Sequence, residues 1–98
     1  GMKKEALRNI LPLGSVITLK KGRKKLIIIG RIQEERSSGI LYDYAAVLYP
    51  EGILDASELY MFQGEDIDRI YHVGLQEEEE FAFRSYMEQK LKELKLLE

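Results

Sequence analysis

The chain has 98 residues and a mass of 11.4 kDa, which is the size of one domain with a single small core. Hydrophobic residues make up 45% and charged residues 33% of it, a balance typical of globular proteins. The longest apolar runs, Leu26–Ile29 and Ala45–Tyr49, fall far short of the roughly 20 residues of a membrane-spanning helix. Because the chain has no cysteine and no charged-then-apolar leader, disulfides and thiolate chemistry are excluded, and we expect a cytoplasmic protein without membrane contact.

The charge is unevenly distributed along the chain. Residues 1–36 carry ten Lys or Arg and three Glu, a net charge of +7, whereas residues 37–98 carry five basic and fourteen acidic residues, a net charge of −9. Such asymmetry can steer a charged partner, but in a compact domain the two signs can also face each other. We favour the second interpretation.

The first third of the chain predicts a short helix and a hairpin. The apolar spacing in Lys3–Ile10 predicts a helix of about two turns, because Pro12 disfavours helical geometry in the residue before it. β-Branched residues predict one strand over Ser15–Lys20 and a second over Lys25–Gln33, joined at a basic tip as a hairpin.

The second strand has two unusual features. Leu26–Ile29 is apolar on both strand faces, which predicts a central strand covered on each side. Gly30 predicts a bulge or bend, as in strands that curl into small barrels. Strand character resumes over Ile40–Tyr49 until Pro50, so we expect a three-stranded antiparallel meander.

The residue pattern predicts secondary structure less clearly in Ile53–Gln63 than in the segments after it. Ile53–Gln63 fits either a helix or a short strand, whereas the alternation in Ile67–Val73 predicts a fourth strand. From Gln76 to Leu97 the periodicity is helical, with Glu77–Glu80 at the positive helix end. We expect Phe83, Met87 and Leu91 to pack on the sheet, and the distal Leu94, Leu96 and Leu97 to be exposed.

Together these elements predict one α+β domain over residues 1–98, with a strand-rich part at about 13–75 and a C-terminal helix at about 76–97. The strongly bent antiparallel sheet has four or five strands, with an SH3-like barrel as one form of it, and the helix packs against it.

The side chains that could take part in catalysis or metal binding have simpler structural interpretations. His72 is the only histidine, and its neighbours in sequence supply no partner for general base catalysis. Glu65, Asp66 and Asp68 lack the spacing of a calcium loop, and Glu77–Glu80 fits a helix start. We therefore predict no catalytic residue, no metal and no cofactor, and expect a protein that is not an enzyme.

The basic hairpin tip is the one patch suited to phosphate backbones. Its anion-binding candidates are Lys21, Arg23, Lys24 and Lys25 within the run Lys20–Lys25. A nucleic-acid-binding small barrel is thus the alternative function. We rank it second because lysines at a hairpin tip also protect sheet edges from aggregation.

Several segments resemble a known family. In order along the chain they are Leu11–Val16, Lys25–Arg31, Tyr42–Tyr44, Leu48–Gly52 and Asp66–Asp68. Their order and spacing resemble the small bacterial proteins grouped as domain-of-unknown-function family 4176, over about Leu11–Leu75. Members occur in Gram-positive bacteria, often encoded near LXG-type toxins of the type VII secretion system. The resemblance implies a cytosolic accessory or chaperone-like role toward a secreted effector, and it implies no catalytic residues.

Our leading interpretation is therefore a non-catalytic protein-binding adaptor. Tyr42 and Tyr44 share one strand face, which either joins the core or is presented outward beside Arg31. Tyrosine and arginine dominate binding energy at interfaces, so the outward alternative makes these three residues candidates for protein binding. Leu94 and Leu97 are further candidates, because we expect the end of the long helix to extend beyond the domain, where it can self-associate or bind another protein.

Overall fold

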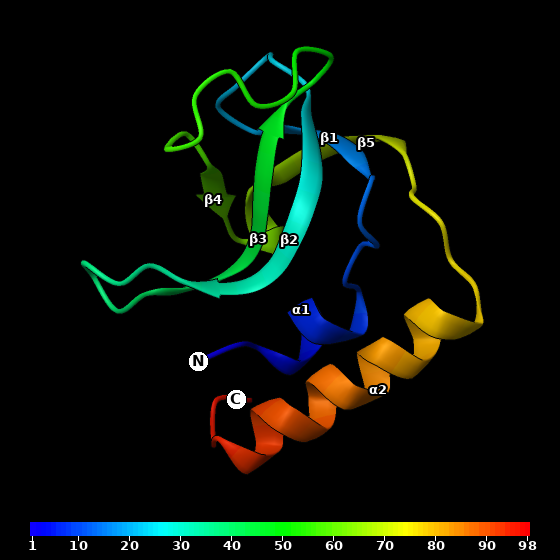
Figure 1. Cartoon of the computed structure of the whole chain (residues 1–98). Coiled ribbons are helices and arrows are strands. Elements are labelled where there is room, and N and C mark those ends of the chain that lie inside the picture. Colours follow the sequence, from blue (N-terminus) through cyan, green and yellow to red (C-terminus); the bar gives the residue numbers. More distant parts are fainter.

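The computed structural model describes every residue from Gly1 to Glu98, and it has two layers, with a five-stranded antiparallel sheet on one side and two helices on the other (Figure 1). The elements in chain order are α1 (Lys4–Arg8), β1 (Val16–Leu19), β2 (Leu26–Glu34), β3 (Leu41–Leu48), β4 (Tyr60–Phe62), the 3-10 turn η1 (Gly64–Asp66), β5 (Ile67–His72) and α2 (Glu78–Glu93). The predicted α+β class is confirmed.

The sheet has the strand order β4-β3-β2-β1-β5. The predicted meander of β1, β2 and β3 is confirmed, and β5 returns from the far end of the chain to pair with β1. The sheet is not closed into a complete barrel, because β4 and β5 at its two ends do not pair with each other. Because β4 is only three residues long and pairs with β3 alone, β4 and β5 remain the two open edges.

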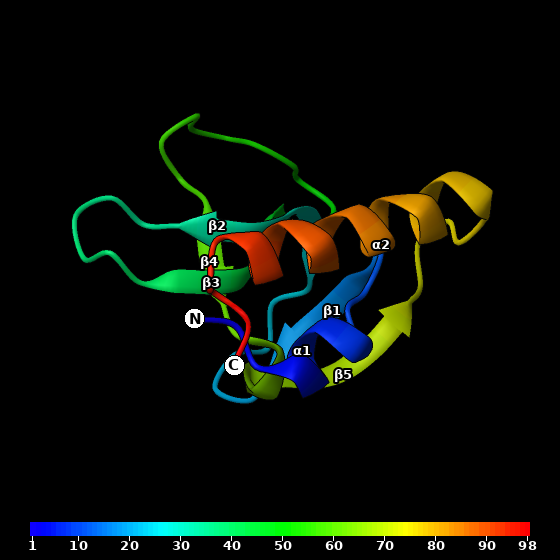
Figure 2. The same ribbon diagram turned by 90° about the horizontal axis from the view of Figure 1, so that it is seen from below.

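Strand β2 is central, and its predicted bulge is confirmed, because the pairing register with β3 shifts between Ile28 and Gly30. The expectation that both faces of this strand are covered is wrong at Ile29, which is exposed. Figure 2 shows the reason: both helices lie on the same side of the sheet, so they cover only one of its faces.

The ambiguous segment Ile53–Gln63 contains a strand and no helix. Only Tyr60–Phe62 is regular, and it pairs with β3, where the Tyr44 and Phe62 rings stack with centroids 5.5 Å apart. Ile53 and Leu54 in the preceding loop are exposed.

The core lies between the sheet and the helices. Its ten buried residues come from every layer: Met2, Ile10, Ile17, Leu26, Ile28, Tyr44, Ala46, Phe62, Met87 and Leu91. Since α1 contributes no fully buried residue of its own, this five-residue helix depends on the packing of its neighbours.

Helix α2 is shorter than predicted. It begins after Glu77, whose carboxylate accepts the N–H groups of Glu79 and Glu80, and ends in a Schellman motif. There Lys95 has a φ of 58°, and the N–H of Leu96 donates to the carbonyl of Leu91. The motif turns the chain back toward the sheet.

The two termini then lie side by side (Figures 1 and 2). The N–H of Met2 donates to the carbonyl of Leu96, and the N–H of Glu98 donates to the carbonyl of Met2. Leu96 and Leu97 pack against the core, so their predicted exposure is wrong. The exposure predicted for Leu94 is confirmed.

The buried face of α2 is rotated from the predicted one. Met87 and Leu91 are buried as expected, but Phe83 is 48% exposed. Glu80 and Arg84 take the inward positions before Met87. The reason is a buried cation on the sheet, Arg31, whose charge Glu80 neutralises.

Candidate functional site

Strand β5 forms an open edge of the sheet. Its backbone pairs only with β1, so the N–H and C=O groups of its other edge have no strand partner. All its residues after Ile67 are exposed, and they include the large apolar side chains of Ile70 and Tyr71, followed by exposed Val73. An apolar strand edge of this kind is a template for another extended chain.

The path of the chain after β5 keeps this edge accessible. Gly74 lies against the start of β1, where its N–H donates to the Ser15 hydroxyl at 3.0 Å. From there the segment up to Glu77 runs along the outside of the molecule to α2 (Figure 1). The edge is therefore held in place at its end without being covered by a further strand.

A groove of about 630 Å³ lies beside the beginning of β5. Residues of α1, β3, η1 and β5 line it, and its charged members are Glu5, Asp43, Glu65, Asp68 and Lys3. The Lys3 ammonium lies 3.5 Å from the Glu65 carboxylate, and both side chains are exposed. Carboxylates outnumber the cation, so the groove favours positively charged groups.

Asp43 is the buried carboxylate of this groove. Its Oδ2 accepts the N–H of Gly64 at 2.8 Å, and the Gln63 side chain fixes the strand by accepting the Asp43 N–H and donating to the Leu41 carbonyl. Burial raises the pKa of the Asp43 carboxyl above its usual 3.8, against the lowering effect of the Gly64 N–H. Asp43 thus joins β3 to the turn that starts β5.

Tyr44 forms the apolar wall of the groove. Its hydroxyl accepts the N–H of Leu11 at 2.9 Å, which ties the segment after α1 to β3. Burial raises the pKa of the Tyr44 phenol above its usual 10.0. The hydroxyl therefore remains protonated at neutral pH and acts as a structural acceptor.

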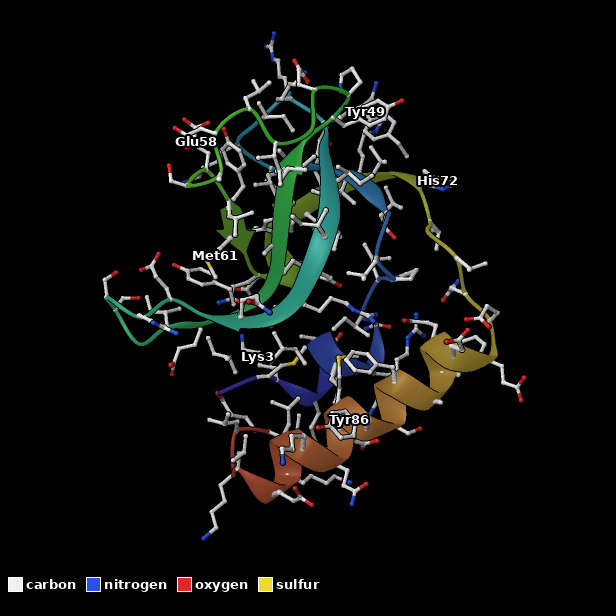
Figure 3. All side chains as sticks on the ribbon, viewed as in Figure 1. Lys3, Tyr49, Glu58, Met61, His72 and Tyr86 are labelled. Atoms are coloured by element: carbon white, nitrogen blue, oxygen red, sulfur yellow. The ribbon has the colours of Figure 1, made fainter.

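The other titratable side chains do not assemble around this groove. His72 is exposed, and Figure 3 shows it at the outer side of the molecule, where β5 leads into the segment before α2. Asp66 accepts the N–H of Gln63 in a capping box of η1. No three His, Asp or Glu side chains are arranged to hold a metal ion, and no helix is long and apolar enough to span a membrane.

The comparison with protein families matches residues 10–83 to the domain of unknown function DUF4176. The chain belongs to the DUF4176 family. The matched range holds all five strands, the groove wall at Tyr44 and the first turns of α2. Neither curated proteins nor solved structures yielded a match.

In this DUF4176 domain the tyrosine face predicted for protein binding is turned inward. Tyr44 is 3% exposed and Tyr42 is half-buried. After the bulge at Gly30, Arg31 pairs with Tyr44 across the sheet and so lies on the same inner face. The outward alternative for Arg31, Tyr42 and Tyr44 is therefore wrong.

Arg31 instead forms a buried ion pair with α2. Its side chain is 4% exposed, and its two terminal nitrogens donate to both oxygens of Glu80, which is 10% exposed. Arg31 also donates to the Leu11 carbonyl at 3.3 Å, and Arg84 donates to Glu80 at 2.8 Å. Hydrogen bonding to Arg31 lowers the pKa of the Glu80 carboxyl below its usual 4.5, and Arg84 adds to the effect.

The predicted anion-binding residues of the hairpin tip are all exposed: Lys21, Arg23, Lys24 and Lys25. Two of them have partners within the chain. The Lys24 ammonium lies 2.7 Å from a Glu51 oxygen, and the Lys25 ammonium lies 4.8 Å from the centroid of the Tyr71 ring. Part of this positive charge therefore serves contacts within the domain.

The sequence patterns did not predict the buried role of Asp43 or the ion pair of Glu80 with Arg31. Asp43 interrupts an otherwise apolar strand, which is the pattern of a buried carboxylate with a defined partner. Glu80 lies on the same helical stripe as Met87 and Leu91, four residues before Arg84. Both signals were present in the sequence, but the partners of these carboxylates come from distant segments.

Proposed function

We propose that this DUF4176 domain is a non-catalytic protein-binding adaptor that takes up an extended segment of its partner along β5. The observation that carries the proposal is the open edge of β5, on which Ile70 and Tyr71 are exposed. In strand addition, backbone hydrogen bonds supply affinity and alternate side chains supply specificity. Both kinds of group are free on this strand.

The groove beside the edge adds a preference for charge. Glu65 and Asp68 flank the beginning of β5, and Asp43 lies behind them. A partner segment with a basic side chain at this end would meet an excess of carboxylates. The partner segment that fits is thus extended, apolar along β5 and basic toward the groove.

We take the class of partner from what the family resemblance implies. Members of the family are often encoded near LXG-type toxins of type VII secretion, so the partner that we propose is a secreted effector. The domain would act as its cytosolic accessory or chaperone-like factor, holding an exposed segment of the toxin before export.

The experiment is co-expression with the toxin encoded nearest to the domain, followed by affinity capture. The variant Ile70→Lys with Val73→Lys places two charges on the exposed edge, and Ile53→Lys with Leu54→Lys places two charges on exposed apolar residues of another loop. We expect both variants to melt like the wild type. The edge variant should lose capture at least about tenfold, which corresponds to about 1.4 kcal/mol.

If the edge variant captured the toxin as well as the wild type does, β5 would not be part of the interface. Absence of any toxin binding by the wild type would contradict the proposed partner. The nucleic-acid alternative has its own readout: binding of random single-stranded DNA or RNA that is lost in Lys21→Glu with Lys24→Glu would favour the basic hairpin tip instead.

A further inference from the structure

A second exposed stripe lies on α2, apart from β5. Glu79, Phe83, Tyr86, Lys90 and Leu94 follow one another at intervals of three or four residues, so they share one side of the helix. All five are exposed, with Tyr86 at 55% and Leu94 at 58%. Figure 3 marks Tyr86 on this helix. The stripe borders the buried row of Met87 and Leu91 but is not part of it.

From this stripe we infer that α2 binds α2 of a second copy of the chain, antiparallel and around a two-fold axis. When the axis passes between Arg84 and Ser85, Phe83 of each copy lies opposite Tyr86 of the other. The same axis places Glu79 of each copy opposite Lys90 of the other. One placement therefore matches aromatic to aromatic and acid to base, as a self-complementary two-fold interface requires.

The aromatic pair is already ordered for this contact. The rings of Phe83 and Tyr86 stack within one copy, with centroids 5.9 Å apart and planes inclined by 24°. The Arg31 guanidinium lies 5.6 Å from the centroid of the Phe83 ring and supports it from the sheet side. Fixed aromatic side chains lose little rotamer freedom on binding, which favours them as anchors.

The charge pattern of α2 selects the antiparallel direction. The first turn holds Glu78, Glu79 and Glu80, and the last turn holds Lys90 and Lys92. Antiparallel helices bring the acidic end of one copy to the basic end of the other, whereas parallel helices would bring like charges together. Within one copy Lys90 approaches only Glu93, at 3.7 Å and with both side chains exposed, a contact of little energetic value.

The extent of the stripe limits the strength of the dimer. One side of a 16-residue helix offers less area than the roughly 800 Å² per partner of a standard interface. We therefore expect a reversible dimer with a dissociation constant in the micromolar range. Because its ion pairs are solvent-exposed, the dimer should weaken as salt is added.

Charge reversal gives the sharpest test, with sedimentation velocity as the measurement of mass. Glu79→Lys alone and Lys90→Glu alone each place like charges opposite each other, so each should remain monomeric where the wild type dimerises. The double variant Glu79→Lys with Lys90→Glu should dimerise again. An equimolar mixture of the two single variants should also dimerise, because each chain then carries the charges that the other lacks.

Tyr86→Glu should abolish the dimer. Glu78→Lys reverses a charge in the same helical turn as Glu79 but off the stripe, so it should leave the antiparallel pairing intact. Circular dichroism melting at low concentration checks that every variant is folded. A wild type that stays monomeric throughout the micromolar range overturns the inference. So do single variants that dimerise as strongly as the wild type, or a mixture that stays monomeric. None of these outcomes bears on toxin capture through β5.

Discussion

Replacing Glu80 with Gln tests the buried ion pair that joins α2 to the sheet. Gln keeps the size of the side chain and one acceptor oxygen, but it removes the charge that balances Arg31. With the Arg31 side chain only 4% exposed, its cation would stay out of water without a counter-charge. Removing one partner of a buried pair costs about 3–5 kcal/mol, a large share of the roughly 5–15 kcal/mol that stabilises a small domain.

The assay is urea unfolding at neutral pH, supported by thermal melting. At about 4–8 °C per kcal/mol for a domain of this size, a loss of about 3 kcal/mol lowers the melting temperature by at least about 12 °C. Glu78→Gln is the matched control, because it neutralises an exposed carboxylate in the same helical turn. That control should cost no more than about 1 kcal/mol. If Glu80→Gln were no more costly than the control, the ion pair would contribute nothing to the fold.

The pair also makes a specific prediction about pH. Hydrogen bonding to Arg31 depresses the pKa of the Glu80 carboxyl in the folded state below 4.5. Its stabilisation is therefore complete above the unfolded pKa and is lost as the pH falls through the lower folded pKa. Wild-type stability should fall in this acid window, and that part of the fall should be absent in Glu80→Gln. An apolar double variant, Arg31→Met with Glu80→Leu, should recover most of the stability.

Three further predictions concern the groove and the end of β5. Asp43→Asn should gain stability relative to the wild type as the pH rises through the raised pKa of the Asp43 carboxyl, because only the wild type then has to ionise a buried group. Urea unfolding across acid pH measures this, and an equal pH dependence of the two proteins would contradict it. Tyr44→Phe should lose about 1–3 kcal/mol, since the N–H of Leu11 loses its acceptor; an unchanged melting temperature would mean that water replaces the hydroxyl. Gly74→Ala should destabilise the domain by about 1–3 kcal/mol, because a Cβ there would lie 2.0 Å from the Leu13 carbonyl oxygen; the denaturation midpoint measures this, and a neutral result would show that the chain shifts freely.

Local patterns in the sequence determined the elements of the domain. Strands β1 and β2 follow from β-branched runs, and β3 follows from its tyrosines and Val47. The bulge follows from Gly30 within an apolar strand. The beginning of α2 follows from its run of glutamates, with Glu77 as the cap. These features depend on residues close together in the chain, so they can be recognised before the fold is known.

Only the tertiary structure decided which faces turn inward. The predicted buried row, Phe83, Met87 and Leu91, and the observed one, which begins at Glu80, share Met87 and Leu91. Periodicity alone therefore cannot choose between them. The choice depends on Arg31, which the bulge in β2 turns toward the helix. In the same way, the open edge exists because β5 pairs with β1 from the far end of the chain. Burial and strand pairing depend on contacts between distant segments, so they cannot be predicted from the residues of one segment alone.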